Sequence, residues 1–99
     1  MNDRTDWRVA QLAPVVNAIS IAAGSIARDF GHVVEIADLK QDAAILAATN
    51  PDRVLAYLAD EANPGHLVRW LWSRLRDQYR PVVRRANRVV STDRLEAGV

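Results

Sequence analysis

The sequence predicts an all-α protein, a compact bundle of about four to five helices in one small domain. Apolar residues recur at spacings of three and four, and no stretch alternates between apolar and polar residues as a half-buried strand does. Two Asn-Pro pairs, at positions 50–51 and 63–64, have the form of helix starts. With 99 residues, 49% of them apolar, the chain is long enough for one packed core.

The first helix is expected in the 19 uncharged residues between Arg8 and Arg28. This stretch is long enough to suggest a membrane span, but Asn17, Ser20 and Gly24 share one helical face with Arg28. It also lacks the basic start of a signal peptide, so we expect no membrane association. We predict the central helix of the bundle, buried on most sides. Its expected inward residues are Leu12, Val15, Val16, Ile19, Ala22, Ala23, Ile26 and Phe30.

Two shorter helices are expected next. Gly31 is placed to end the first helix in a left-handed conformation, and a second helix then runs from Ile36 or Asp38 to Thr49. The Asn-Pro pair at positions 50–51, followed by an acidic residue, opens a third helix that extends through Leu58.

The last long helix is expected to open at the Asn-Pro pair at positions 63–64 and to run to about Arg80. Pro81 is predicted to kink or break it, because proline lacks a donor and clashes with the preceding turn. Residues 82–90 can resume as helix. The predicted domain therefore spans residues 1–90, and residues 91–99 are expected to form a flexible polar tail.

The net charge of +1 conceals two halves of opposite sign. Residues 1–63 carry nine acidic and five basic side chains, a net charge of −4, whereas residues 64–99 carry eight arginines and three acidic residues, a net charge of +5. This asymmetry favours a nucleic acid or another polyanion as partner of the basic half. The chain has no cysteine, which excludes disulfides and thiolate metal sites and fits the cytoplasm.

The arginines of the last helix form the strongest candidate site. At about 100° per residue, five of them fall on a stripe about a third of the circumference wide, beside Trp70, Trp72 and Tyr79. Guanidinium groups bind phosphates and the aromatic rings can stack on bases, so the stripe is a candidate DNA interface. Alternatively, the aromatic residues belong to the core and the arginines form a solvated face. The stripe consists of Arg69, Arg76, Arg80, Arg84 and Arg88.

An acidic face is expected on the second helix, where Asp38, Gln41 and Asp42 follow Glu35 at spacings of three and four. On its own this pattern is equally explained by Asp38 as a helix cap and Asp42 as a solvated residue.

Catalysis is not expected. His32 and His66 have no partner at metal-ligand or triad spacing, and the adjacent pair Asp60-Glu61 points to different helix faces. We therefore predict no metal, no cofactor and no enzymatic activity.

Two segments together resemble a known family. They are IARDFGHVVEIADLKQDAAILAA, at residues 26–48, and HLVRWLWSRLRDQYRPVVRR, at residues 66–85. Their order is similar to that of the second conserved region of bacterial RNA polymerase sigma factors, where an acidic Asp-Leu-x-Gln-Glu helix precedes an aromatic and basic helix. Asp38-Leu39-Lys40-Gln41-Asp42 matches the first motif with Asp for the final Glu, and the second motif matches in character.

The resemblance implies two interfaces. In the family the acidic helix binds the polymerase core and the basic helix melts and binds promoter DNA. Asp38, Gln41 and Asp42 thereby become candidate polymerase contacts. The implied DNA contacts are Arg69, Trp70, Trp72, Arg74, Arg76 and Arg80.

The chain departs from the family in having an additional Asn-Pro helix between the motifs and no room for a second DNA-binding domain. These features suit a short, stand-alone sigma-like protein of the kind that phages encode. Trp70 and Trp72 face different sides of one helix, so one of them is expected in the core.

The leading hypothesis is a small transcription-related protein that binds DNA through its basic helix and RNA polymerase through its acidic helix. A second hypothesis is a protein-interaction module, either a homodimer or a phage-type inhibitor of a host protein, whose Trp- and Arg-rich helix is the interface. A helix-turn-helix repressor built on residues 36–58 is less well supported, because no glycine turn joins its two helices.

Overall fold

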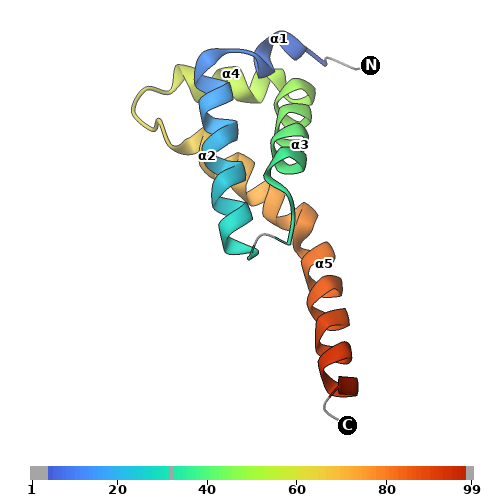
Figure 1. Cartoon of the computed structure of the whole chain (residues 1–99). Coiled ribbons are helices and arrows are strands. Elements are labelled where there is room, and N and C mark those ends of the chain that lie inside the picture. The colour runs from blue at the N-terminus through green and yellow to red at the C-terminus, as the bar shows by residue number, and fades with distance from the viewer. Residues whose placement is uncertain (1–4, 32, 98–99) are drawn as a thin grey trace.

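The computed structural model describes the backbone of residues 5–31 and 33–97 and the side chains of residues 5–31 and 33–85. All regular secondary structure in this part of the chain is helical, which confirms the predicted all-α class (Figure 1). The helices are α1 (Trp7–Ala10), α2 (Ala13–Asp29), α3 (Ile36–Thr49), α4 (Pro51–Ala59) and α5 (His66–Ala97).

Helix α2 packs on both α3 and α5, and most of its predicted inward residues are buried. Three are not: Leu12 and Val16 are 40% and 47% exposed, and Phe30 is only partly buried. The prediction that α2 is buried on most sides is therefore wrong for one face. In a chain this short, α3 and α5 cover one side of α2 and leave the other to solvent.

Helices α3 and α4 begin and end where the sequence predicts. Gly31, just after α2, has a φ of 63°, a left-handed conformation that glycine adopts without steric cost. Asn50 is the N-cap of α4 and Pro51 its first residue. The Asn50 side-chain amide, however, donates to the carbonyl oxygen of Leu46 at 2.9 Å, so it closes the end of α3 instead of capping α4.

Helix α5 begins at His66, two residues after the Asn-Pro pair that was predicted to open it. The Asn63 amide donates instead to the Asp60 carboxylate at 3.1 Å, which holds the pair in the connecting loop. The break predicted at Pro81 does not occur. Pro81 and Asp77 are both exposed, so water can satisfy the Asp77 carbonyl that loses its helical donor.

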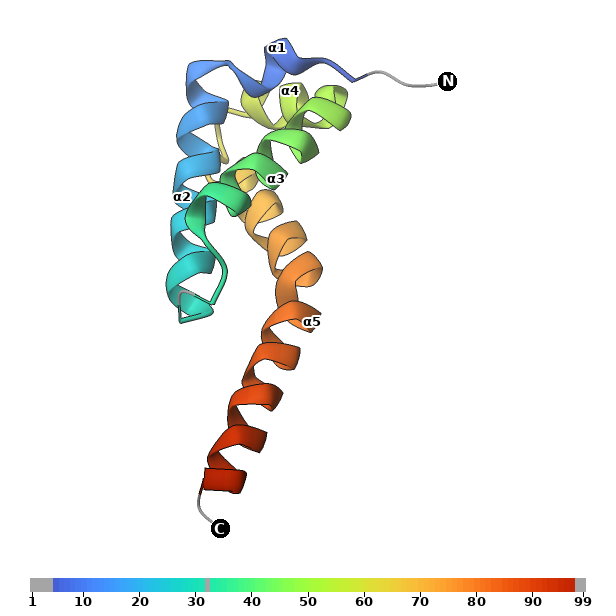
Figure 2. The ribbon, with the colours of Figure 1, turned by 45° about the vertical axis from the view of Figure 1, so that its right-hand side comes forward.

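Helical backbone continues past position 90, where the sequence predicts a tail, to Ala97. Neither glycine nor proline occurs between Val82 and Ala97, so nothing in the sequence forces an earlier end. Val83 still packs against the core, and beyond it helix α5 leaves the bundle in both views (Figures 1 and 2); we term residues 82–97 the α5 arm. The radius of gyration of 16.3 Å exceeds the value of about 13 Å typical of a compact domain of this length.

The core lies where α5 crosses α2, α3 and α4. Its largest fully buried side chains include Leu71 and Leu75 of α5, Ile26 of α2, Leu39 of α3 and Val54 of α4. All five helices thus contribute to one apolar core, α5 as far as Val83, and this core fixes the direction in which the arm leaves the bundle.

Candidate nucleic-acid interface

Five arginines of α5 are exposed, and none forms an ion pair with an acidic residue in the part of the chain that the structure describes. Four of them were predicted as candidate DNA contacts. Guanidinium groups without carboxylate partners are available to bind phosphates without first breaking an internal contact. The five are Arg69, Arg74, Arg80, Arg84 and Arg85.

Arg85 is missing from the sequence prediction, because the stripe was defined on one helix face and Arg85 lies about 100° further around than Arg84. The adjacent pair Arg84-Arg85 was the signal in the sequence that the basic surface extends beyond the stripe. The predicted contact Arg88 lies outside the described side chains.

Arg76 differs from the other described members of the stripe, because it packs against Trp72 and is only partly exposed. Its guanidinium carbon lies 4.7 Å from the centroid of the Trp72 ring. Its Nε atom is buried without a hydrogen-bond partner in the described part of the chain, and its nearest acidic group is Asp77, at 3.6 Å. Arg76 therefore covers one face of the Trp72 indole and is only partly available to a ligand.

The two tryptophans face different helices, as their spacing predicts. The indole N–H of Trp72 donates to the Asp29 carboxylate of α2 at 3.3 Å. The centroid of the Trp70 ring lies 6.1 Å from that of the Tyr57 ring in α4. The guanidinium carbon of Arg53 lies 5.7 Å from the same Trp70 centroid.

The expectation that one of these tryptophans belongs to the core is wrong, since both are partly buried at its edge. Each ring has an arginine over one face, so less ring surface is left for a stacking base. The contacts of Arg53 and Asp29 depend on tertiary packing, and no local sequence pattern indicated them.

On α3, the three predicted polymerase contacts lie in two different environments. Asp38 and Gln41 are exposed. Asp42 is partly buried and accepts hydrogen bonds from the Tyr79 hydroxyl and, at 3.1 Å, from the Gln78 amide of α5. The carboxylate of Asp42 is thus bound within the molecule. Asp38 is not a cap, because the N-cap position of α3 is held by Glu35.

The contact with Asp42 also changes the chemistry of Tyr79. Burial, together with the hydrogen bond to the Asp42 carboxylate, raises the pKa of the Tyr79 hydroxyl to about 12. Tyr79 therefore remains a neutral hydrogen-bond donor across the physiological pH range.

His66 packs its ring edge against Tyr57, with centroids 5.8 Å apart, and its Nδ1 lies 3.8 Å from the Asp60 carboxylate. Within the described residues, no three His, Cys, Asp or Glu side chains come close enough together to hold a metal ion. His32 lies outside the described residues. His66 therefore packs against Tyr57 and Asp60 at the start of α5.

Comparison with protein-family models, with curated proteins and with solved structures finds no match to the chain. In the described part of the chain, no helix combines the length and the apolar character needed to cross a membrane.

Proposed function

We propose that this chain is a small DNA-binding protein of bacterial or phage transcription, acting in the cytoplasm without a cofactor. In this proposal α5 binds the phosphate backbone and α3 docks on RNA polymerase, as the resemblance to the second sigma-factor region suggests. The observation that carries the proposal is the set of five exposed arginines along α5 without acidic partners among the described residues.

The shape of α5 supports duplex DNA as the partner. An isolated helix is about 10–12 Å across with its side chains, which matches the width of the major groove, about 12 Å. The α5 arm stands clear of the bundle, so it can approach a groove without a clash from the other helices (Figure 2). Arg80, Arg84 and Arg85 surround the place where the arm leaves the bundle and can contact phosphates on both sides of a groove.

The tryptophans have a supporting role in this proposal. Because an arginine lies over each ring, we assign Trp70 and Trp72 to positioning α5 on α4 and α2. Phosphate contacts then supply the affinity, and binding is expected to depend strongly on salt.

The proposed polymerase contact rests on the exposed part of α3. Asp38 and Gln41 are both exposed to solvent, one turn apart on the same helix. Asp42 is engaged by α5, so its role in this proposal is to hold α3 and α5 together.

The test is a titration of labelled duplex and single-stranded DNA with the purified chain at several salt concentrations. We expect duplex binding whose logarithmic slope against salt is about −0.9 per phosphate contacted, hence about −4 to −5 for five arginines. The double variant Arg80→Glu/Arg84→Glu should bind more weakly and with a slope smaller by about two.

A matched control is the double variant Arg28→Glu/Lys40→Glu, which changes the net charge equally at two exposed positions on α2 and α3. This control should retain the slope of the unmodified chain. No binding to either DNA at low salt, or equal losses in the two double variants, would refute a DNA interface on α5.

A further inference from the structure

Asp77 lies in the middle of the exposed face of α5, with arginines on both sides. Arg74 precedes it by three residues and Arg80 follows it by three, so at about 100° per residue they lie about 60° to either side of Asp77. All three residues are exposed. On the other side of the helix, Leu71 and Leu75 are fully buried in the core. An acidic side chain thus occupies the centre of the candidate interface.

Two further arginines extend the basic flanks along the helix. Arg69 lies on the side of Arg80, and Arg85 lies on the side of Arg74. Both are exposed. Each flank therefore carries two guanidinium groups about 16 Å apart along the helix axis. This arrangement suits a groove of duplex DNA, because a phosphate backbone lies on each side of the groove and the residue between the flanks faces the base edges.

The carboxylate of Asp77 is available for a new hydrogen bond. Its side chain is 66% exposed, and the ion contact that the structure gives it among the described residues is with the Nη2 atom of Arg76, at 3.6 Å. This distance is too long for a hydrogen bond. The Arg76 guanidinium is itself packed on the Trp72 ring. Asp77 therefore gives up little when it binds a ligand.

A carboxylate in this position restricts the base that it can meet. It accepts hydrogen bonds and is repelled by phosphates, so inside a groove it is stabilised by a donor. In the major groove the donors are the amino groups of cytosine and adenine, whereas guanine and thymine present acceptors. Adenine also has the N7 acceptor beside its amino group, and this acceptor repels a carboxylate. Cytosine is therefore the base that an aspartate recognises best.

We propose that Asp77 gives the α5 interface a base preference, because its carboxylate accepts a hydrogen bond from the amino group of a cytosine in the major groove. This inference rests on the proposed binding of duplex DNA by α5. The flanking arginines hold the phosphates, and such contacts carry no sequence information of their own. The carboxylate lowers the affinity for DNA in general and thereby raises the discrimination between sequences.

Selection from a pool of duplex DNA with a randomised central segment tests the proposal. The unmodified chain should enrich duplexes that carry a C·G pair at one fixed position. In a fluorescence-anisotropy titration of a selected duplex, replacement of that pair by T·A should weaken binding about tenfold, because one base contact is lost.

The variant Asp77→Asn distinguishes recognition of a base from general repulsion. An asparagine amide pairs best with adenine, so this variant should enrich an A·T pair at the same position. Circular dichroism checks that it folds, and the change is at an exposed position.

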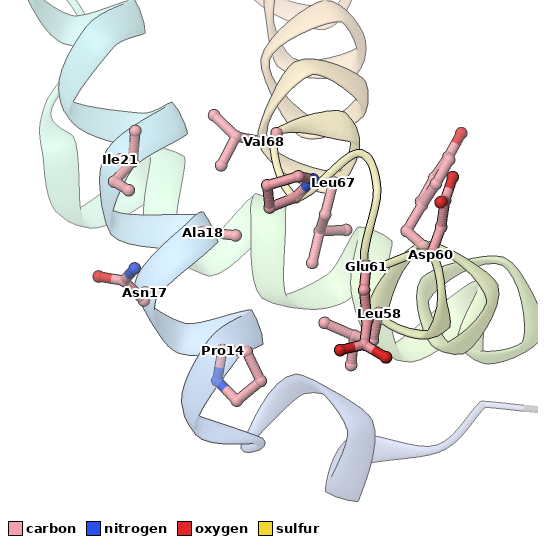
Figure 3. A pocket seen from close by; sticks show the side chains of 12 residues that line it. Pro14, Asn17, Ala18, Ile21, Leu58, Asp60, Glu61, Leu67 and Val68 are labelled. Carbon is pink, nitrogen blue, oxygen red and sulfur yellow. The ribbon is translucent and has the colours of Figure 1, made fainter.

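The matched control is Glu61→Gln, which also removes one negative charge at an exposed position. Glu61 lines a hollow together with Leu67, in the first turn of α5 (Figure 3). Leu67 precedes Asp77 by about 15 Å along the helix. This control should enrich the same C·G pair as the unmodified chain.

Two outcomes would overturn this inference and leave DNA binding by α5 intact. One is salt-dependent binding without an enriched base, or with the same base enriched by the unmodified chain and by Asp77→Asn. The other is an equal gain of affinity of Asp77→Asn for every duplex, which would show that the carboxylate only repels phosphates. Absence of binding to any duplex at low salt would overturn the proposed function as well.

Discussion

The hydroxyl of Tyr79 in α5 donates a hydrogen bond to the carboxylate of Asp42 in α3. The Gln78 amide donates to the same carboxylate, so two consecutive residues of α5 hold one acidic residue of α3. The contact lies just before Pro81 and within four residues of Val83, which still packs against the core. Asp42 therefore helps to set the direction of the α5 arm.

Removing either end of this contact should destabilise the fold. We expect Tyr79→Phe and Asp42→Ala each to lower the free energy of unfolding by about 1–2 kcal/mol, because a hydrogen bond to a charged group is lost. The double variant should cost less than the sum of the two, since both remove the same bond. Urea denaturation followed by circular dichroism measures these values. Asp38→Asn, an exposed change on the same helix, should have little effect.

The raised pKa of Tyr79 predicts a pH dependence at the alkaline end. The pKa of the hydroxyl is about 12 in the folded state and about 10 in the unfolded chain. Its contribution to stability is therefore complete below pH 10 and is lost between about pH 10 and pH 12. Denaturation curves across this range should show a steeper loss of stability for the unmodified chain than for Tyr79→Phe. Parallel pH profiles for the two proteins would contradict this assignment.

Two leucines provide a matched test of the core. Leu71 is fully buried, and Leu55 is 46% exposed. Leu71→Ala should lower the free energy of unfolding by about 2–5 kcal/mol, because it removes buried methyl groups and leaves a cavity. Leu55→Ala should cost less than about 1 kcal/mol. Thermal or chemical denaturation distinguishes them, and equal losses would show that α5 does not pack as described.

The proposed docking of α3 on RNA polymerase predicts a specific loss. Immobilised protein should retain purified core polymerase, and Asp38→Arg should abolish that retention, because it reverses the charge of an exposed residue on α3. Asp77→Arg makes the same change of charge on the exposed side of α5 and should leave retention intact. Failure of the unmodified chain to retain polymerase would remove this half of the proposed function and leave the DNA half standing.

Local signals in the sequence were sufficient for α3 and α4. Gly31 and the Asn-Pro pair at positions 50–51 act through the backbone of their own neighbours, so their effect does not depend on tertiary contacts. The second Asn-Pro pair was misleading, because the Asn63 amide is bound by Asp60 and the helix begins only at His66. Neither asparagine side chain caps the helix that follows it, and only the first of the two prolines is the first residue of a helix.

The candidate site was only partly predictable. Helical spacing identified the exposed arginines Arg69, Arg80 and Arg84, because exposure on a long helix follows from its register. It also grouped Arg76 with them, although Arg76 packs on Trp72. The engagement of Asp42 by Tyr79 joins residues 37 positions apart, and pairing over such a separation depends on how α3 crosses α5.

A small bend of α5 at Pro81 moves the far end of the helix by a large distance. At Pro81 one backbone donor is missing, and proline is the usual place at which helices bend. Because the arm beyond it is about 24 Å long, a rotation of about 10° at this point displaces its far end by about 4 Å. The bundle can therefore remain rigid while the tip of the arm follows a curved surface, and the reach of the protein depends on the stiffness of a single turn.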